Sequence, residues 1–383
     1  MSSSSFEMRP TYIEVDCQKL RSNLDVIQNH LFQKDQQKIP IMAIVKANAY
    51  GHGIVEIAQF LQKQNIDYLG VAFLEEGIEL RQNGIVIPIL VLGGILGEQI
   101  PHFIEYDLTL TASSVDKFES IETYCQQNNT TARVHLKIDT GMERIGIHYY
   151  SVTPLLEKAK QSNFVVTEGV FSHFANADDL DLTHAQQQLQ RFQNVLEASK
   201  ELGLSFRYIH MANSGAILQM PESWFSMVRL GILMYGVYPN PQISKTIPVQ
   251  PILSWHTKIV YFKVIQPHHP VSYGSTWQSE TQTRLVTLPV GYGDGYHRRV
   301  SGQAQVLLRG KRYNVVGVVC MDQMMVNINW DSGYNGDDVI LIGDQGEESI
   351  TIEELANWSG TISYEILTSI NKRVPRKYIN KMN

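Results

Sequence analysis

Cysteine, and an excess of charge of either sign, are what the sequence most clearly lacks. Its 383 residues include three cysteines, Cys17, Cys125 and Cys320, and its formal net charge is −6. Three widely spaced cysteines form neither a disulfide framework nor a zinc site, so no metal is expected and a reducing, cytoplasmic compartment is favoured. No cluster of lysine and arginine interleaves with aromatic residues, which excludes a nucleic acid as the expected partner.

Long hydrophobic runs are also missing. The most apolar stretch, residues 85–96, is interrupted by Pro88, Gly93 and Gly94, and it is too short to span a bilayer. The first ten residues are rich in serine and lack an apolar core, so we expect no signal peptide. A chain of this length is comfortable as two domains. These features predict a soluble enzyme or binding protein with no membrane partner.

Short apolar runs alternate with longer amphipathic stretches through the first two-thirds of the chain. Parallel strands need crossover helices between them, so this alternation predicts a parallel sheet. Eight such runs over roughly 200 residues favour a closed (β/α)8 TIM-like barrel, and a doubly wound open sheet is the alternative. The predicted strands span residues 41–45, 68–73, 89–92, 108–111, 133–138, 168–172, 208–211 and 229–233, and the clearest predicted helices span residues 54–65, 75–83, 115–127 and 183–202.

The pattern changes after residue 238. Four prolines between residues 239 and 251 predict a linker, and β-rich segments separated by turn signals follow it. We therefore predict a barrel domain at residues 11–245 and a mostly-β domain at residues 246–383, which the strand at residues 11–16 is a candidate to join. The β-rich segments span residues 253–264, 284–289, 305–308, 313–319, 325–328 and 338–342, with a late helix at residues 352–358.

The segment IMAIVKANAYGHG, residues 41–53, is the strongest single feature of the sequence. Lys46 follows five apolar residues of a predicted buried strand, where an ammonium group is expensive to desolvate. A lysine in that position has a lowered pKa and becomes a nucleophilic amine suited to a Schiff base. The alternative is a rim lysine whose amine reaches out to water. Gly51 and Gly53 would let the backbone approach a ligand closely.

Polar residues occur at or after the ends of three further predicted strands and on a fourth. The fifth strand runs into residues 137–144 (KIDTGMER), the sixth into His173, the seventh into residues 213–215 (NSG), and Arg229 begins the eighth. Each of these alone also has a structural explanation, such as a core histidine or a rim ion pair. Because the strand ends of a barrel converge on its active-site face, their shared location favours function.

A phosphate site is predicted after the seventh and eighth strands. The backbone N–H groups of Gly231 and Ile232, together with the Ser214 hydroxyl, could cradle a phosphate where barrels commonly hold one. A Schiff-base lysine combined with a phosphate site points to pyridoxal phosphate as the cofactor.

Motifs along the chain match one known family in the right order. VKANAYGHG at residues 45–53 looks like the cofactor-lysine motif of the alanine racemases, and the resemblance runs from Tyr12 to about Tyr378. The fold that it implies, a pyridoxal-phosphate barrel plus a β domain, agrees with the fold predicted above. Further matching motifs are KIDTGMERIG (137–146), GVFSHFANAD (169–178), HMANSGA (210–216), RLGILMYG (229–236), VSYGST (271–276), LPVGYGDGY (288–296), VCMDQ (319–323) and SYEILTSINKRVPR (363–376).

The resemblance implies two catalytic bases. Lys46 would anchor the cofactor and serve the D-alanine face of the substrate, and Tyr273 would serve the L-alanine face. In this family the matching tyrosine reaches the active site of the other subunit, so a homodimer is implied. A tyrosine ionises normally only near pH ~10 and needs cationic surroundings to act as a base. The resemblance places His173 and Arg229 beside Tyr273, where these two side chains would supply the cationic surroundings.

The resemblance also implies the remaining contacts. Arg229 would face the pyridine nitrogen and leave it unprotonated, because a guanidinium keeps its proton. Arg144 and the backbone of Met321 would bind the substrate carboxylate, although Met321 could instead be ordinary core packing. Lys137 matches a lysine that is carbamylated in many members. The implied cofactor contacts are Lys46, Tyr50, His173, Asn213, Ser214, Arg229, Gly231, Ile232 and Tyr364.

The sequence therefore predicts an isomerase, a pyridoxal-phosphate-dependent alanine racemase that interconverts L- and D-alanine and supplies D-alanine for cell-wall synthesis. A broad-specificity or serine racemase is one alternative. Another is an amino-acid decarboxylase of the same fold, whose second-domain cysteine Cys320 superficially matches, although the glycine-rich phosphate loop of those enzymes is absent. A non-catalytic cofactor carrier would be a single barrel without Tyr273.

Overall fold

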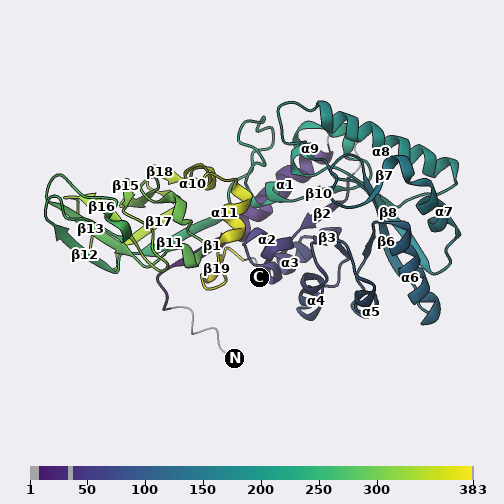
Figure 1. Cartoon of the computed structure of the whole chain (residues 1–383), viewed down its shortest axis with the longest axis horizontal. Helices are drawn as coiled ribbons and strands as arrows, with labels where there is room; N and C mark the ends of the chain where they lie inside the picture. Colours follow the sequence, from purple (N-terminus) through teal and green to yellow (C-terminus); the bar gives the residue numbers. More distant parts are fainter. Residues whose placement is uncertain (1–7, 33–37, 382–383) are drawn as a thin grey trace.

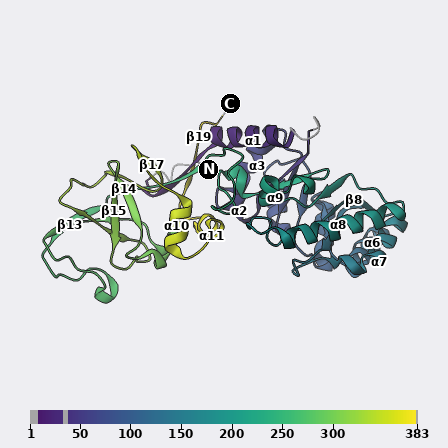
Figure 2. The same ribbon diagram turned by 90° about the horizontal axis from the view of Figure 1, so that it is seen from above.

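The computed structural model describes residues 8–32 and 38–381 as two domains. Figure 1 and Figure 2 show them side by side along the long axis, with the α/β domain on the right and the mostly-β domain on the left. Most of the serine-rich start of the chain, where no signal peptide is expected, lies outside the described residues. None of the helices in the described ranges is long and apolar enough to cross a bilayer.

Eight parallel strands form the α/β domain and close into a barrel. A bridge between Leu90 and Thr109 joins its two sheets on one side, and the Arg229 N–H donates to the Ala212 carbonyl at 2.9 Å on the other. This closure confirms the predicted barrel and excludes the open sheet. In ring order the strands are β10 (Val228–Leu230), β2 (Ile41–Ile44), β3 (Tyr68–Val71), β4 (Ile89–Val91), β5 (Leu110–Ala112), β6 (Ala132–Asp139), β8 (Val165–Phe171) and β9 (Tyr208–His210), with the short β7 (Ile147–His148) on β6.

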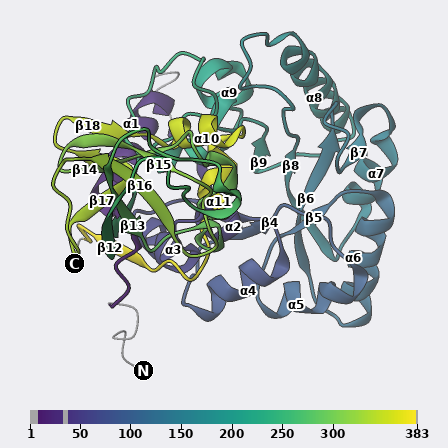
Figure 3. The same ribbon diagram turned by 60° about the vertical axis from the view of Figure 1, so that its left-hand side comes forward.

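Amphipathic helices cover the outside of the barrel (Figure 3). In α3 (Ile54–Lys63) the buried residues are Ile54, Ile57, Ala58 and Leu61, the spacing of one helical face. All four residues of β2 are buried, as expected for a strand covered on both sides. The other barrel helices are α1 (Cys17–Phe32), α4 (Leu74–Gln82), α5 (Ile100–Glu105), α6 (Val115–Gln127), α7 (Thr153–Gln161), α8 (Thr183–Glu201) and α9 (Ser214–Gln219).

The eighth strand is shorter than predicted. It ends at Leu230, and a 3-10 helix, η5 (Ile232–Tyr235), takes the place of its predicted second half. All four residues of η5 are buried. The prediction of a strand to residue 233 was wrong because an apolar run that is buried throughout has no periodicity to separate strand from helix.

The second domain is built on one large sheet, in the order β12-β13-β16-β15-β14-β17-β11-β1-β19. Strand β1 (Tyr12–Asp16) pairs antiparallel with β11 and parallel with β19, so the strand before the barrel belongs to this sheet. The domain boundary predicted at residues 245 and 246 lies between η5 and β11 and stays a prediction. The other strands are β11 (Leu253–Lys258), β12 (Tyr261–Ile265), β13 (Thr283–Leu288), β14 (Gln305–Leu308), β15 (Lys311–Val316), β16 (Met324–Asn329), β17 (Asp338–Gln345), β18 (Glu348–Ile350) and β19 (Arg376–Ile379).

Two helices of the second domain lie at its junction with the barrel. The predicted late helix is confirmed as α10 (Ile352–Ser359), and α11 (Ser363–Ser369), which was not predicted as a helix, contacts the short element α2 (Lys46–Tyr50). A Cβ on Gly51 would lie 2.0 Å from the carbonyl oxygen of Leu367 in α11, so only glycine allows this approach. The second domain therefore contacts the segment that carries Lys46 directly, through α11.

Candidate active site

A cavity of about 460 Å³ opens at the carboxyl ends of the barrel strands, and α11 supplies part of its wall. All but two of the site residues predicted from the sequence line it. Those present are Lys46, Tyr50, Lys137, Arg144, His173, Asn213, Ser214, Arg229, Gly231, Ile232 and Tyr364.

The residues after Lys46 form a left-handed turn. Ala47, Asn48, Ala49 and Tyr50 have φ values of 53°, 55°, 52° and 51°. For residues other than glycine and asparagine this conformation costs roughly 1–2 kcal/mol each, so the surrounding contacts must hold it in place. Its effect is to bring the side chains of Lys46 and Tyr50 into the same cavity.

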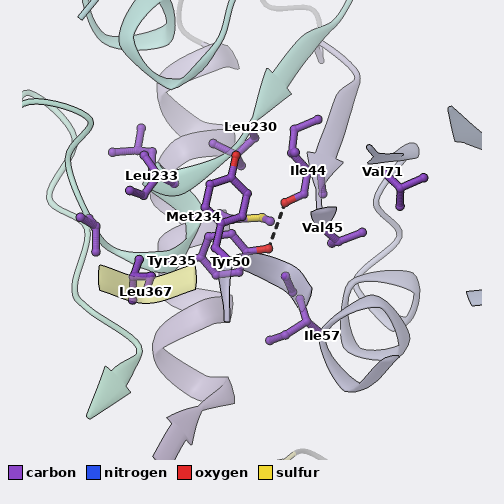
Figure 4. Close-up of a cluster of buried hydrophobic side chains, with 14 of the residues drawn as sticks. Ile44, Val45, Tyr50, Ile57, Val71, Leu230, Leu233, Met234, Tyr235 and Leu367 are labelled. Atoms are coloured by element: carbon purple, nitrogen blue, oxygen red, sulfur yellow. Dashed lines mark hydrogen bonds between the residues drawn. The ribbon is translucent and has the colours of Figure 1, made fainter. Parts of the chain in front are cut away.

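Buried polar contacts stabilise this turn. The Asn48 side-chain oxygen accepts the Ile54 N–H at 2.9 Å. The Nδ1 of His52 lies 2.9 Å from the carbonyl oxygens of both Ala49 and Tyr50. Burial lowers the pKa of His52 to about 4, so the ring is neutral, and two acceptors facing Nδ1 require the proton there. Figure 4 shows Tyr235 beside Tyr50, and the Tyr235 hydroxyl donates to the Ile44 carbonyl at 3.0 Å.

The Lys46 side chain is half-buried in the wall of the cavity. Burial lowers its pKa, Arg144 and Arg229 lower it further, and Glu76 acts in the opposite direction. More of the amine is therefore neutral at a given pH than in a free lysine, which is the form that attacks a carbonyl or accepts a proton. A fully solvated rim lysine does not fit this position.

Arg229 lies at the centre of the site and is almost fully buried. Its Nη2 donates to His173 Nδ1 at 2.9 Å, and its Nη1 donates to His210 Nδ1 at 3.1 Å. Burial lowers the pKa of Arg229 to about 9, with Arg144 contributing, so the cation persists at neutral pH. Both histidines accept at Nδ1 and therefore carry their proton on Nε2. Among the described residues the Nε of Arg229 has no hydrogen-bond partner, which leaves this donor for a ligand.

Hydroxyl groups and a glycine form a cradle in the wall of the same cavity. The Ser214 Oγ accepts the N–H groups of Gly231 and Leu233 at 3.2 and 3.3 Å. A Cβ on Gly231 would stand 3.0 Å from the Tyr50 hydroxyl, so glycine keeps this space open. Burial raises the pKa of Tyr50 and Tyr364, which therefore stay protonated donors. The cradle suits an oxyanion that accepts several hydrogen bonds.

Asn213 has a structural contact as well as a place in the wall. Its side-chain oxygen accepts the Ala216 N–H at 3.0 Å and caps α9. The amide N–H₂ remains available to donate to a ligand.

Lys137 and Arg144 add positive charge to the cavity. Lys137 is 3% exposed, and its Nζ donates to the Ile138 carbonyl at 2.9 Å. Burial, followed by the charge of Arg229, lowers the pKa of Lys137 to about 7. The carboxylate of Asp139 accepts the N–H groups of Gly141 at 2.7 Å and of Arg144 at 3.2 Å, which fixes the turn that carries Arg144. These cations make the cavity a site for an anionic ligand.

Comparison with known proteins identifies the family. Models of the alanine racemase N-terminal and C-terminal domains match residues 15–239 and 252–378. An alanine racemase from Carboxydothermus hydrogenoformans is 40% identical over 374 residues, which cover 97% of this chain and 100% of that protein. The chain belongs to the alanine racemase family.

Solved structures of the family agree with this fold. The structure of an alanine racemase from Bacillus anthracis with bound L-Ala-P is 37% identical, has a TM-score of 0.90, and covers 97% of this chain and 95% of its own. A histidine racemase from Leuconostoc mesenteroides is 28% identical, has a TM-score of 0.89, and covers 98% of this chain and 99% of its own. The fold therefore also serves a racemase that is named for a different amino acid.

Two residues that the racemase resemblance assigns to the site lie elsewhere in this chain. Tyr273 and Met321 line a separate hollow of about 920 Å³ in the second domain, where they are 69% and 53% exposed. The exposure of Met321 excludes the alternative that it is core packing. A single chain therefore forms the Lys46 cavity without any contribution from its own Tyr273.

A chain of polar groups next to Arg229 was not predicted from the sequence. His210 Nε2 lies 2.8 Å from His135 Nδ1, and His135 Nε2 lies 3.4 Å from Glu168. The Tyr68 hydroxyl donates to the same carboxylate oxygen of Glu168 at 2.8 Å. Burial lowers the pKa of both histidines, so they are neutral. All four side chains stand on segments predicted as buried strands, and polar residues in such segments are the signal that could have found them.

Proposed function

We propose that the cavity binds pyridoxal phosphate and that the protein interconverts L- and D-alanine. The observation that carries this proposal is one cavity holding an amine of lowered pKa, Lys46, a buried cation, Arg229, and a hydroxyl-lined cradle at Gly231. Lys46 would anchor the cofactor, the free Nε–H of Arg229 would face the ring nitrogen, and the cradle would hold the phosphate. When bound, the cofactor supplies the electron sink that makes the substrate Cα–H acidic.

The cradle supports a phosphate in particular. Its donors are the hydroxyls of Tyr50, Ser214 and Tyr364 and the backbone N–H of Ile232, around the space that a side chain at Gly231 would fill. A phosphate accepts several such donors at once, and barrels commonly place it after strands seven and eight.

Two residues would move the proton. The neutral amine of Lys46 would take it from, or return it to, Cα on the D-alanine face, and the phenolic oxygen of Tyr273 would do so on the L-alanine face. Since Tyr273 lies outside the Lys46 cavity of its own chain, a second chain would supply it, and the proposed enzyme is a homodimer. His173 accepts from Arg229 at Nδ1, so its Nε2–H is left to donate to the phenolate and favour its ionisation.

The substrate carboxylate would bind to Arg144 and to the backbone N–H of Met321 from the second chain. The cationic surroundings of Lys46 support an anionic substrate. All three cysteines are unpaired, which supports the proposed cytoplasmic location, and supply of D-alanine for the cell wall is the role that we propose with it.

A racemisation assay tests this proposal. Purified protein with added pyridoxal phosphate is incubated with L-alanine, L-serine, L-lysine and L-histidine, and kcat/KM is compared across the panel. The largest value is expected for alanine; a preference for serine or histidine would overturn the substrate. Carbon dioxide released from lysine, ornithine or diaminopimelate would identify a decarboxylase instead, and a yellow protein that is inert with both alanine enantiomers would identify a carrier.

Carbamylation of Lys137 is the first prediction. A carbamate forms only from the neutral amine, and the Lys137 amine becomes neutral as the pH rises through about 7. We expect a carbamate resonance in the ¹³C NMR spectrum of protein in ¹³C-bicarbonate. Its intensity should grow between pH 6 and pH 8, which is about one pH unit on either side of the pKa of the Lys137 amine. Lys137→Arg is the control and should lack the signal. A spectrum identical in both proteins would contradict the assignment.

The second prediction concerns the cradle. Gly231→Ala should weaken the affinity for pyridoxal phosphate about tenfold, because the methyl group fills space between the donors. This loss equals ~1.4 kcal/mol, the size of one hydrogen bond. Equilibrium titration of the apoprotein measures the affinity, and a melting curve checks that the fold is intact. Gly97→Ala is the matched control, since a Cβ there meets nothing within 4 Å. Equal affinities in the two variants would rule out Gly231 as part of the phosphate site.

A further inference from the structure

Glu76 joins the ends of two barrel strands just behind Lys46. One oxygen of its carboxylate, Oε1, accepts the Ala47 N–H at 2.7 Å, and the other, Oε2, accepts the Ala72 N–H at 2.7 Å. Ala47 follows strand β2 and Ala72 follows strand β3, so one side chain from α4 fixes the spacing of two neighbouring strand ends. Bonds from backbone N–H groups to a carboxylate are charge-assisted and stronger than those between neutral groups.

The bond to Ala47 acts on the first residue of the left-handed turn. Ala47 follows Lys46 directly in the chain and has a φ of 53°. Strained conformations of this kind persist only where the surroundings determine them. Asn48 and His52 hold the later part of the turn, and Glu76 holds its beginning, the part that sets the direction of the Lys46 side chain.

We propose that Glu76 is a positioning residue for Lys46, which holds the amine in place and tunes it as the base that acts on D-alanine. This inference rests on the proposed function. The role of Glu76 is electrostatic as well as geometric, because its carboxylate places a negative charge at the start of the turn, next to Lys46. No proton is transferred to or from Glu76 itself.

The charges around Lys46 support this role. Burial lowers the pKa of the amine, the cations Arg144 and Arg229 lower it further, and Glu76 raises it. Lys137 in its amine form, His173 and the two tyrosines of the cradle, Tyr50 and Tyr364, line the same cavity without a negative charge at neutral pH, and the exposed Glu365 of α11 also lines it. Among the charged groups that shift the pKa of Lys46, Glu76 is the one that raises it.

A purely structural role is the competing explanation. Glu76 also accepts the Phe73 N–H at 3.3 Å and so completes the capping box at the start of α4. Loss of a helix cap would lower stability and activity without distinguishing the two faces of the substrate. When pyridoxal phosphate is kept saturating, so that cofactor retention is not limiting, a positioning role for Lys46 as a base affects the D-alanine face more than the L-alanine face. This difference makes the two explanations separable.

The test compares Glu76→Gln with the control Glu79→Gln, which removes the same charge from an exposed residue one turn along α4. Solvent deuterium is measured in D-alanine and in L-alanine recovered with unchanged configuration. For Glu76→Gln we expect incorporation into D-alanine to fall about tenfold, as is typical when a supporting residue is lost, and incorporation into L-alanine to change less than about twofold. An equal fall for both enantiomers, or no difference from Glu79→Gln, would overturn the proposal.

A second measurement does not depend on racemase activity. Competitive acetylation of the full-length apoprotein across pH, read by mass spectrometry, gives the midpoint at which Lys46 becomes reactive. The midpoint should move to lower pH in Glu76→Gln, because a negative charge is lost, and should stay near that of the wild type in Glu76→Asp, which keeps the charge. A midpoint in Glu76→Gln equal to that of the wild type would contradict the proposed electrostatic effect of Glu76 on Lys46. If wild-type protein exchanged neither enantiomer, the proposed function would fail while the midpoint still tested Glu76.

Discussion

Replacing Lys46 with alanine is expected to abolish racemisation and to prevent stable retention of pyridoxal phosphate. The variant loses both the amine that would anchor the cofactor and the base on the D-alanine face. A general base alone contributes about 10²–10⁴ in rate, so kcat should fall at least about a thousandfold. The visible absorbance of the lysine-bound cofactor should disappear from the purified protein.

Lys63→Ala is the matched control for this variant, since it removes an exposed lysine from the end of α3. Borohydride reduction followed by peptide mass spectrometry should place the cofactor on the peptide with Lys46 in the control and on no peptide in Lys46→Ala. A retained absorbance band in Lys46→Ala would show that another lysine is the anchor.

Tyr273→Phe is expected to separate the two faces of the substrate. The phenol is the proposed base on the L-alanine face, and phenylalanine keeps the ring but has no proton acceptor. Incorporation of solvent deuterium into recovered L-alanine should fall by about 10²–10⁴, while incorporation into recovered D-alanine, which depends on Lys46, should change little.

The control is Tyr261→Phe, because Tyr261 lines the same hollow of the second domain and is 54% exposed. It should leave both rates near those of the wild type. If Tyr273→Phe lowered the two rates equally, the assignment of one base to each face would be wrong.

The barrel could be predicted because its strands are buried on both faces and therefore form short apolar runs. Strand β2 is buried throughout, and the amphipathic pattern of α3 marks the helix that follows it. The location of Lys46 followed from the same pattern, since a lysine after a buried strand is unusual enough to be noticed. The contact of Tyr364 with the cofactor was predicted only from the family resemblance.

The left-handed turn could not be predicted from local sequence. Lys46-Ala-Asn-Ala-Tyr50 contains no glycine, and its alanines favour a right-handed helix. The contacts that select the turn come from distant residues: the carboxylate of Glu76, and the second domain through Arg376, which donates to the Gly51 carbonyl at 3.0 Å. Local preference was overridden here by tertiary contacts.

The location of Tyr273 could not be predicted from sequence patterns. Tyr273 is 69% exposed in a hollow apart from the Lys46 cavity, so one chain does not bring the two proposed bases together. The proposed second chain rests on the family resemblance, and mixed dimers test it directly.

Subunit mixing tests the central claim, that Lys46 and Tyr273 act together from different chains. Lys46→Ala and Tyr273→Phe proteins, each nearly inactive alone, are mixed in equal amounts under conditions that exchange subunits. Random pairing in a two-fold dimer makes about half of the dimers mixed, each with one intact site of its two, so about a quarter of wild-type activity should return. Activity that stays at the sum of the two separate variants would contradict a site shared between chains.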